Sequence, residues 1–327
     1  MKSYIIKRLF TIIPMMIGIS FIMFVVMHLA PGDPSSMRYG MNPEVSGSAR
    51  AEFSKMYGLD KPVTVQYMLW VKRILALDFG RSLTDDQPVM KKIAERLPAT
   101  LLLQFSSMVL IFGIAVPLGI FSAVNRNSFF DKGTTILVFI GYATPSFWLA
   151  LLMILLFGVK LQWLPISGMN PWYTEYMSDF DKAKDLIRHM ILPVTATAFG
   201  SLAALSRYSR SSMIEVMEEK YILTARAKGL TRGRTIFVHA LKNALLPMVT
   251  IMGLSLPALI SGSFIFETIF SWPGMGRLGY EAVMNYDYPV VMGVGIIATL
   301  LTLIGIFVSD ILYAVVDPRI RLDIKRG

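Results

Sequence analysis

The stretch RYSRSSMIEVMEEKYILTARAKGLTRGRTIFVHALKNALLP, residues 207–247, decides the fold, because it inserts a long charged segment into a very apolar chain. Its centre, ARAKGLTRGRT at residues 225–235, carries four basic side chains and no acidic one. A chain that crosses a bilayer has to present such a segment outside the hydrocarbon core, since charged side chains are costly within it. The side of the membrane on which this segment lies, and its partner there, are the first questions that the sequence raises.

The stretch is patterned as two amphipathic helices joined at a glycine. Gly229 can end the first helix, because glycine tolerates the left-handed conformation, and Thr231 can cap the second. The apolar positions are Met213, Met217, Tyr221 and Ala225 in the first helix, and Ile236, Phe237, Ala240, Leu241 and Ala244 in the second. Small residues at the corner let another surface approach closely, so we expect a protein-docking corner. Lipid headgroups and nucleic acid are the alternative partners for its charge.

The composition is typical of a membrane protein. Of 327 residues, 54% are hydrophobic and only 17% are charged, whereas soluble domains have about 45–50% apolar and about 25% charged residues. The absence of cysteine excludes disulfides, thiolate nucleophiles and cysteine-bound metals. The net charge of +10 is informative mainly through its distribution between the two sides of the membrane.

Six stretches are apolar and long enough to cross a hydrocarbon core, which takes about 20 helical residues. The predicted spans are residues 9–30, 99–123, 134–159, 190–207, 247–267 and 290–316. The first span has an apolar run too long for a signal peptide, and no small-residue cleavage site follows it. We therefore predict an all-α membrane protein with six transmembrane helices and a partly helical external segment between the first two spans.

The predicted organisation has four parts. Residues 1–30 form the N-terminal tail and first span, and residues 31–98 form the external segment, with amphipathic stretches at 62–77 and 88–97. A five-span core follows at 99–316, contains the docking loop 208–246, and leads into a tail at 317–327. Residues 160–189 are expected to be irregular.

The distribution of charge orients these spans. One side, which includes both termini and the docking loop, has 17 Lys and Arg against 6 Asp and Glu, and the other has 15 against 14. The positive-inside rule therefore predicts that both termini and the docking loop are cytoplasmic. An even number of spans agrees with this arrangement.

Several catalytic and nucleotide-binding patterns are absent from the sequence. It has no G-x-x-x-x-G-K-[ST], no H-E-x-x-H and no G-x-S-x-G, and its three histidines are far apart. The run GMGRLG, with Gly274, Gly276 and Gly279, has dinucleotide-fingerprint spacing, but it follows an apolar span rather than a strand. We interpret it as a tight turn before an interfacial helix, and we expect no enzyme activity.

At the docking loop the sequence resembles the integral membrane subunits of binding-protein-dependent ABC importers. Thr224, Ala225 and Gly229 match the small-residue and glycine positions of their cytoplasmic loop. Leu223 stands where the general family has Glu, and Leu246-Pro247 comes later than usual, and both departures resemble the peptide and nickel subgroup. Further similar runs are KRLF with the later Pro14, APGDP (30–34), YGLDKP (57–62), residues 209–216, ETIFSWPGMGRL (267–278), DYPVV (287–291) and VDPRIR (316–321). Together they resemble the B-type permease subunit of this subgroup over nearly the whole chain.

The resemblance implies a six-span, type I importer fold and a non-catalytic subunit in a bacterial or archaeal cytoplasmic membrane. Such a subunit would pair with a homologous second permease subunit and form half of a pathway for dipeptides or oligopeptides. An extracytoplasmic binding protein would deliver the peptide, and two cytoplasmic ATPase subunits would carry ATP and magnesium, while this chain would bind no cofactor or metal. The ATPase-docking residues would be Thr224, Ala225, Arg226, Ala227, Lys228 and Gly229.

Two further groups are candidate functional residues. The turn Trp272, Pro273, Gly274, Met275 and Gly276 is predicted to be external and to meet the binding protein. Glu267 and Asp310 are acids at or within spans, where ionisable residues are functional candidates. Either one can serve the pathway or its gating, or can make a structural hydrogen bond.

Two alternative functions stay open at this point. The same architecture can import nickel, glutathione or another small solute, and the sequence does not separate these from peptides. A self-sufficient secondary transporter is the alternative from a different class. It would predict paired charges within the spans and an inverted repeat, whereas the sequence shows two isolated acids and no evident repeat.

Overall fold

The computed structural model describes residues 2–29, 61–169 and 177–316, which are folded mainly as helices. The longer elements in chain order are α1 (Lys2–Leu29), α4 (Val63–Leu75), α5 (Val89–Val124), α6 (Phe129–Ala143), α7 (Ser146–Met153), η1 (Ile154–Lys160), α8 (Asp179–Glu218) and α9 (Lys220–Ala227). They are followed by α10 (Arg232–Arg234), η3 (Thr235–Ala240), α11 (Leu241–Ala244), α12 (Leu246–Leu254), α13 (Ala258–Ser261), α14 (Phe264–Ile269), α15 (Met275–Met284) and α16 (Tyr288–Val316). The tail at 317–327 and residues 30–60 of the predicted external segment lie outside the described residues.

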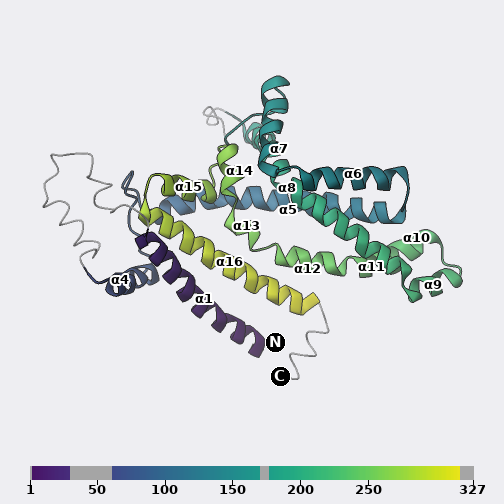
Figure 1. Cartoon of the computed structure of the whole chain (residues 1–327), viewed down its shortest axis with the longest axis horizontal. Helices are drawn as coiled ribbons and strands as arrows, with labels where there is room; N and C mark the ends of the chain where they lie inside the picture. The colour runs from purple at the N-terminus through teal and green to yellow at the C-terminus, as the bar shows by residue number, and fades with distance from the viewer. Residues whose placement is uncertain (1, 30–60, 170–176, 317–327) are drawn as a thin grey trace.

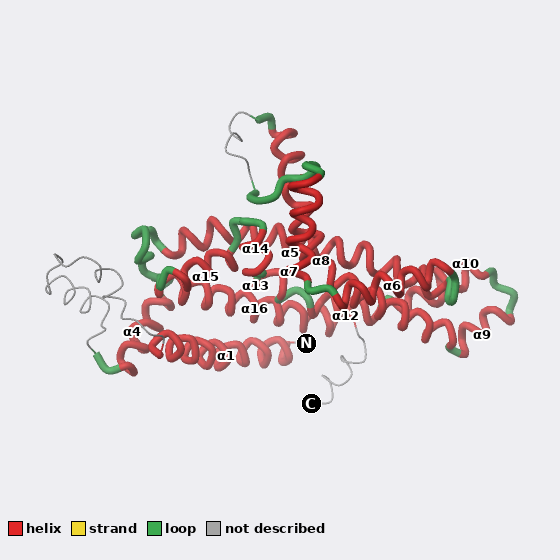
Figure 2. Tube along the Cα trace, turned by 45° about the horizontal axis from the view of Figure 1, so that its top comes forward, coloured by secondary structure: helices red, strands yellow, loops and turns green. Residues whose placement is uncertain are grey.

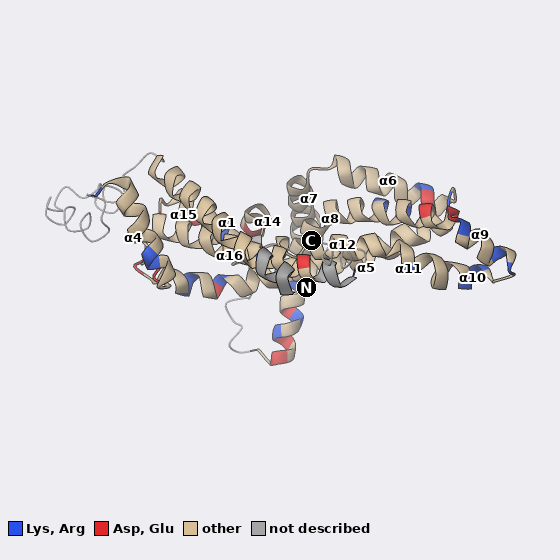
Figure 3. Ribbon diagram, turned by 90° about the horizontal axis from the view of Figure 1, so that it is seen from below, with Lys and Arg blue, Asp and Glu red and all other residues tan. Residues whose placement is uncertain are grey.

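The described chain forms an elongated body with different structures at its two ends. Helices α4 and α15 lie at one end, and α9 and α10 lie at the other (Figure 1). In Figure 3 the residues coloured as charged lie mostly at these two ends and on the first turns of α8, whereas few are seen on the helices between them. The described part of the predicted external segment, residues 61–98, and the predicted docking corner therefore lie at opposite ends of an apolar middle.

Four of the predicted spans correspond to continuous helices. Helices α5, α8 and α16 contain the spans predicted at 99–123, 190–207 and 290–316, and α1 covers the described part, 9–29, of the span predicted at 9–30. Helix α5 starts ten residues before the prediction, and the 40 residues of α8 include 179–189, which we had expected to be irregular. Within the described ranges, five helices are long and apolar enough to cross a membrane, or six if one bent pair is a single span.

The bent pair is α6 with α7 and η1. The span predicted at 134–159, in which Pro145 is expected to cause a kink, is broken there rather than kinked within one helix. The two parts meet at an angle of 102°. Thr144 has extended backbone angles, φ −87° and ψ 120°, and Pro145 precedes the first turn of α7. The bend falls at Thr144 because proline disfavours the helical conformation in the residue before it.

The span predicted at 247–267 is also wrong as a single helix. Helix α12 ends at Leu254, and only the short helices α13 and α14 follow it before Ile269. Gly262 lies between them with φ +67°, a conformation that favours glycine. The long apolar helix in this region is instead Arg232–Leu254, which begins inside the predicted docking loop.

Close helix contacts hold the two halves of the body. Helices α5 and α8 pack side by side, and a Cβ at Gly119 of α5 would lie 2.8 Å from the backbone nitrogen of Arg210 in α8. Helices α1 and α16 also run side by side (Figures 1 and 2), and Arg8 pairs with Asp310 at 3.2 Å. Asp310 therefore forms an ion pair between helices, whereas the sequence analysis considered a gating role or a structural hydrogen bond.

A tight turn around Glu267 connects α14 to α15. The carboxylate is fully buried, and it accepts hydrogen bonds from the Thr100 hydroxyl at 3.0 Å and the Arg277 backbone N–H at 2.9 Å. A Cβ at Gly274 would collide with this carboxylate, and one at Gly276 would lie 2.7 Å from the Phe264 backbone nitrogen. The glycine spacing of GMGRLG is therefore explained by a close approach of backbone to a buried acid.

We predict that Gly274→Ala destabilises the protein by about 1–3 kcal/mol, because the added methyl group overpacks the Glu267 site. Gly113→Ala is the matched control, since a Cβ at this helical glycine of α5 has no atom within 4 Å and alanine favours helix. Unfolding of the two purified variants in the same mild detergent measures the difference. Equal stability of the two would contradict the tight packing at Glu267.

Candidate functional site

The predicted docking corner is built by α8, α9 and α10. Helix α8 ends at Glu218 because Glu219 is extended, with ψ 144°, and α9 follows from Lys220 to Ala227. Gly229 has φ +79°, and the Thr231 side chain accepts a hydrogen bond from the Arg234 backbone N–H at 3.5 Å. The predicted glycine break and threonine cap are confirmed, while the break at Glu219 divides what the sequence predicted as one helix.

The corner presents small, basic and apolar groups together. Ala225 is only 8% exposed and packs inward, and Leu223 is 54% exposed beside it. We define the corner surface as the exposed residues Leu223, Thr224, Arg226, Ala227, Lys228 and Gly229. Behind it lies a buried cluster of Ala123, Met213, Ile222, Ile236, Ala240 and Ala244. Phe237, which we had placed on the apolar side of the second helix, is 68% exposed.

An ion pair fastens the corner to the rest of the body. Asp131, at the start of α6, is 3% exposed and receives the Arg210 guanidinium from α8 at 2.6 Å and 2.8 Å. The Ser122 hydroxyl and the Asn127 backbone N–H also donate to this carboxylate. Asp131 thus joins the end of α5, the start of α6 and the middle of α8.

Sequence reasoning missed this pair. The two residues are 79 positions apart in the chain, and neither belongs to a pattern of fixed spacing. Asp131 was the single acid in the short predicted loop 124–133, and that isolation was the available signal. An acid bounded by two apolar spans has to find a partner when the fold buries it.

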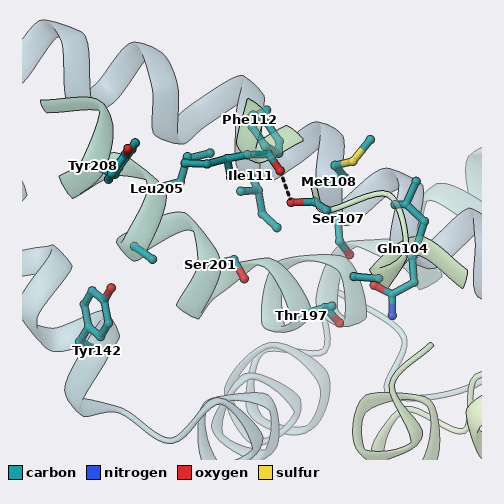
Figure 4. Close-up of a pocket in the computed structure, with 15 residues that line it drawn as sticks. Gln104, Ser107, Met108, Ile111, Phe112, Tyr142, Thr197, Ser201, Leu205 and Tyr208 are labelled. Carbon is teal, nitrogen blue, oxygen red and sulfur yellow. Dashed lines mark hydrogen bonds between the residues drawn. The ribbon is translucent and has the colours of Figure 1, made fainter. Parts of the chain in front are cut away.

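A cavity of about 500 Å³ lies in the middle of the body, between α5, α6, α8, α12 and α13. Figure 4 shows Gln104 and Ser107 of α5 near Thr197 and Ser201 of α8, with Tyr142 and Tyr208 further along the cavity. The hydroxyl oxygen of Thr197 is buried without a hydrogen-bond partner among the described residues. None of the described residues that line the cavity is charged. Such a wall can contact uncharged polar groups and aliphatic carbon.

The predicted external turn faces inward in the structure. Trp272 is fully buried, and its indole N–H donates to the Ala99 carbonyl at 2.8 Å. Met275 is 2% exposed, and its backbone N–H donates to Thr100 at 2.7 Å. The structure thus joins this turn to the beginning of the α5 span. Neither Glu267 nor Asp310 lines the central cavity.

A second polar network holds the same end of the body. The Asp287 carboxylate is 2% exposed and accepts from the Ser82 hydroxyl at 2.5 Å, the Leu83 backbone N–H at 3.0 Å and the Thr84 hydroxyl at 3.1 Å. Nearby, burial opposes ionisation of Asp85, but hydrogen bonds from Lys92 and Ser82 outweigh it and lower the pKa of this carboxyl. The sequence runs DFGRSL and DYPVV therefore lie in contact at this end of the body.

No group of three His, Cys, Asp or Glu side chains able to hold a metal ion occurs in the described part of the chain. The arrangement is instead an apolar helical body with an uncharged central cavity. The hydrogen-bonded network around Asp287 lies at one end, and the basic corner surface lies at the other. These features define a multi-span membrane transport subunit.

The chain belongs to the family described as binding-protein-dependent transport system inner membrane component. The model of this family matches residues 115–322, and the model of its N-terminal part matches residues 1–104. This membership confirms the resemblance that the docking loop and the other sequence runs indicated.

Individual relatives are similar over nearly their whole length. The oligopeptide transport system permease protein AppB of Bacillus subtilis is 43% identical over 98% of this chain and 99% of its own. The dipeptide transport system permease protein DppB of Escherichia coli K12 is 40% identical over 98% of this chain and 99% of its own.

Among solved structures, an inward-facing MetNI methionine ABC transporter chain aligns with a TM-score of 0.55 at 20% identity. The alignment covers 70% of this chain and 97% of that one, and it supports the helical importer fold.

We predict that Asp131→Ala destabilises the protein by about 3 kcal/mol, because it leaves the Arg210 guanidinium without its buried partner. Glu218→Ala is the matched control, since it breaks the exposed Arg126–Glu218 pair at the same end and is expected to cost less than about 1 kcal/mol. Unfolding in detergent compares the two variants. A similar loss for both would mean that Asp131 does not fasten the corner.

Proposed function

We propose that this chain is a membrane-spanning permease subunit of an ATP-driven importer and forms half of the pathway for dipeptides or oligopeptides. The observation that carries the proposal is the placement of an uncharged cavity between two structured ends, one of which presents the basic corner surface. The family membership and the names of the AppB and DppB relatives support the transport class and the peptide substrate. The chain itself performs no hydrolysis, and ATP and magnesium belong to its partners.

The corner surface is proposed to dock into a groove of a cytoplasmic ATPase subunit. Its small residues permit close approach, the exposed Leu223 offers an apolar contact, and Arg226 and Lys228 provide a basic rim. Two ATPase subunits that close on ATP would then move the corners of two permease subunits together. The motion can favour one transporter state only if the docking contacts differ between the states.

The central cavity is proposed to be this chain's share of the pathway. Peptides vary in side-chain charge but always carry backbone N–H and C=O groups. A wall with amide and hydroxyl groups and without charged residues can bind backbone groups while tolerating many side chains. A homologous second permease subunit would close the other side of the pathway.

The opposite end of the body is proposed to receive an extracytoplasmic binding protein that delivers the peptide. Buried Trp272, Met275 and the glycines of their turn would shape this surface from beneath rather than touch the partner themselves. Glu267 would fix that shape through its hydrogen bonds to Thr100 and Arg277. The protein would lie in the cytoplasmic membrane with both termini and the corner surface in the cytoplasm.

We predict that Gly229→Asp abolishes co-purification of an ATP-hydrolysing partner from mild detergent. The aspartate adds bulk and negative charge at the centre of a basic surface, and a side chain is also strained at φ +79°. Co-purified ATPase activity is the measurement. The expected result for the wild type is an active complex, and the expected result for the variant is a permease without bound ATPase.

Two controls separate docking from folding. Gly133→Asp makes the same change at an exposed glycine with no atom within 4 Å of its Cβ, and it should retain the ATPase. Gly229→Ala introduces the backbone strain without the charge, so a partial effect there would measure the contribution of strain. Retention of the ATPase by Gly229→Asp would refute the docking assignment, and solute transport by the isolated chain would favour a secondary transporter.

We predict that the two ends of the body lie on opposite sides of the membrane. The chain lacks cysteine, so single cysteines at two exposed positions report topology without background. A membrane-impermeant maleimide should label Lys91→Cys in intact cells with permeable outer layers, and Lys228→Cys only in inside-out vesicles. Labelling of both positions from the same side would overturn the proposed orientation.

A further inference from the structure

A second cavity, of about 220 Å³, lies between α5, α6 and α8, apart from the central one. Seven of the nine residues that line it are polar or charged, although it lies among membrane-type helices. Two arginines, Arg207 and Arg210, line it together with Val138 and Phe139. Five hydroxyl side chains complete the wall, from Ser122, Thr134, Thr135, Ser206 and Ser211. Nothing in the proposed transport cycle uses this cavity.

The charges around the cavity do not balance. Asp131 is neutralised by the bidentate contact of Arg210. Arg207 is exposed, and among the described residues it forms no ion pair, its guanidinium lying 5.7 Å from the centre of the Phe139 ring. The site therefore has one surplus positive charge and several hydroxyl groups, which together suit an anion with several oxygen acceptors.

The surroundings of the cavity indicate where this anion comes from. Next to it, α6 exposes the apolar side chains of Ile136, Phe139 and Ile140, each more than half exposed. Towards the other end of α6 lie the charged residues Asp131 and Lys132. The cavity thus lies at the boundary between the charged end of the body and its apolar stretch, which is the depth at which lipid headgroups lie.

We propose that this cavity binds the phosphate group of an anionic phospholipid from the cytoplasmic leaflet. Arg207 pairs with the phosphate, and the Ser206 and Ser211 hydroxyls donate to its oxygens, since the Ser122, Thr134 and Thr135 hydroxyls already donate to Asp131. The acyl chains cover the exposed side chains of α6. A free phosphate would satisfy Arg207 but would leave those apolar side chains uncovered. Basic pockets between transmembrane helices on the cytoplasmic side are suited to anionic headgroups.

Bound lipid would have a mechanical consequence. Arg207 and Arg210 are on the same helix, and Arg210 holds Asp131. A phosphate beside Arg207 would therefore lie between α6 and α8, next to the ion pair that joins them. The inference rests on the proposed orientation, because it places the site in the cytoplasmic leaflet.

The test uses the purified full chain and native mass spectrometry to count bound phosphatidylglycerol against phosphatidylcholine. The wild type should prefer phosphatidylglycerol, and Arg207→Gln should weaken that binding roughly tenfold or more, because it removes a charge-assisted contact. Arg226→Gln is the matched control, since it makes the same change in an exposed arginine of the corner surface. The control should bind phosphatidylglycerol as the wild type does.

Each other outcome overturns the proposal. Unchanged binding in Arg207→Gln would show that the lipid binds elsewhere, and an equal loss in Arg226→Gln would show a general charge effect. Displacement of phosphatidylglycerol by millimolar inorganic phosphate would mean that the cavity takes a free anion. Thermal unfolding of the variants in phosphatidylcholine nanodiscs checks that both fold. Because the readout needs neither ATPase nor peptide, it can fail while the transport function stands, and the co-purification experiment can fail while lipid binding stands.

Discussion

The contact between Asp131 and Arg210 is the interaction on which the corner end of the body depends. A carboxylate buried among membrane helices has lost its hydration, and only a full set of donors compensates for that loss. Here the guanidinium supplies two hydrogen bonds, the Ser122 hydroxyl a third and the Asn127 backbone a fourth. The donors come from α8, from α5 and from the turn between α5 and α6, while the acid belongs to α6. Satisfying one acid therefore fixes the relative positions of α5, α6 and α8.

At the other end of the body, a second buried acid is also held by hydrogen-bond donors from separate elements. Glu267 is fully buried, and its donors are a threonine of α5 and a backbone N–H at the start of α15. Glycines surround it, because a side chain would occupy the space of the carboxylate. Helix α5 takes part in both sites, through Ser122 near one end and Thr100 near the other. A single long helix thus connects the corner to the opposite turn.

The fold was predictable from sequence wherever hydrophobic periodicity alone determines structure. The helices at the spans 9–30, 99–123, 190–207 and 290–316, and the glycine corner with its threonine cap, follow from local chemistry. The bend at Thr144 carried a local signal as well, since Pro145 follows it and interrupts the apolar run, but the sequence does not indicate its angle of 102°. Gly262 likewise interrupts an apolar run that the hydropathy pattern treats as continuous.

The candidate sites likewise include features that the local sequence predicts and features that it does not. The corner surface was predictable, because small and basic residues gather within a few positions of Gly229. The inward packing of Trp272 was not, since which face of a short element is buried depends on partners far away in the chain. Asp131 with Arg210, and Ser82 with Asp287, are joined across 79 and 205 positions. Pairings of that kind have no periodic signal within one sequence.

The positions of these sites bear on how motion could pass through the subunit. The corner surface lies on α9 and the loop after it, and the buried cluster behind it includes Met213 of α8. A displacement of the corner therefore acts on α8 directly.

Helix α8 lines the central cavity through Thr197 and Ser201, and it holds α6 through Arg210. Since packed helices move as rigid elements rather than deforming smoothly, a shift of α8 would change the cavity wall and the α6 contact together. The bend at Thr144 then separates α6, which is tied to α8 by an ion pair, from α7, which packs against α8 without one among the described residues. A shift of α8 would therefore act on α6 through an ion pair and on α7 through helix packing.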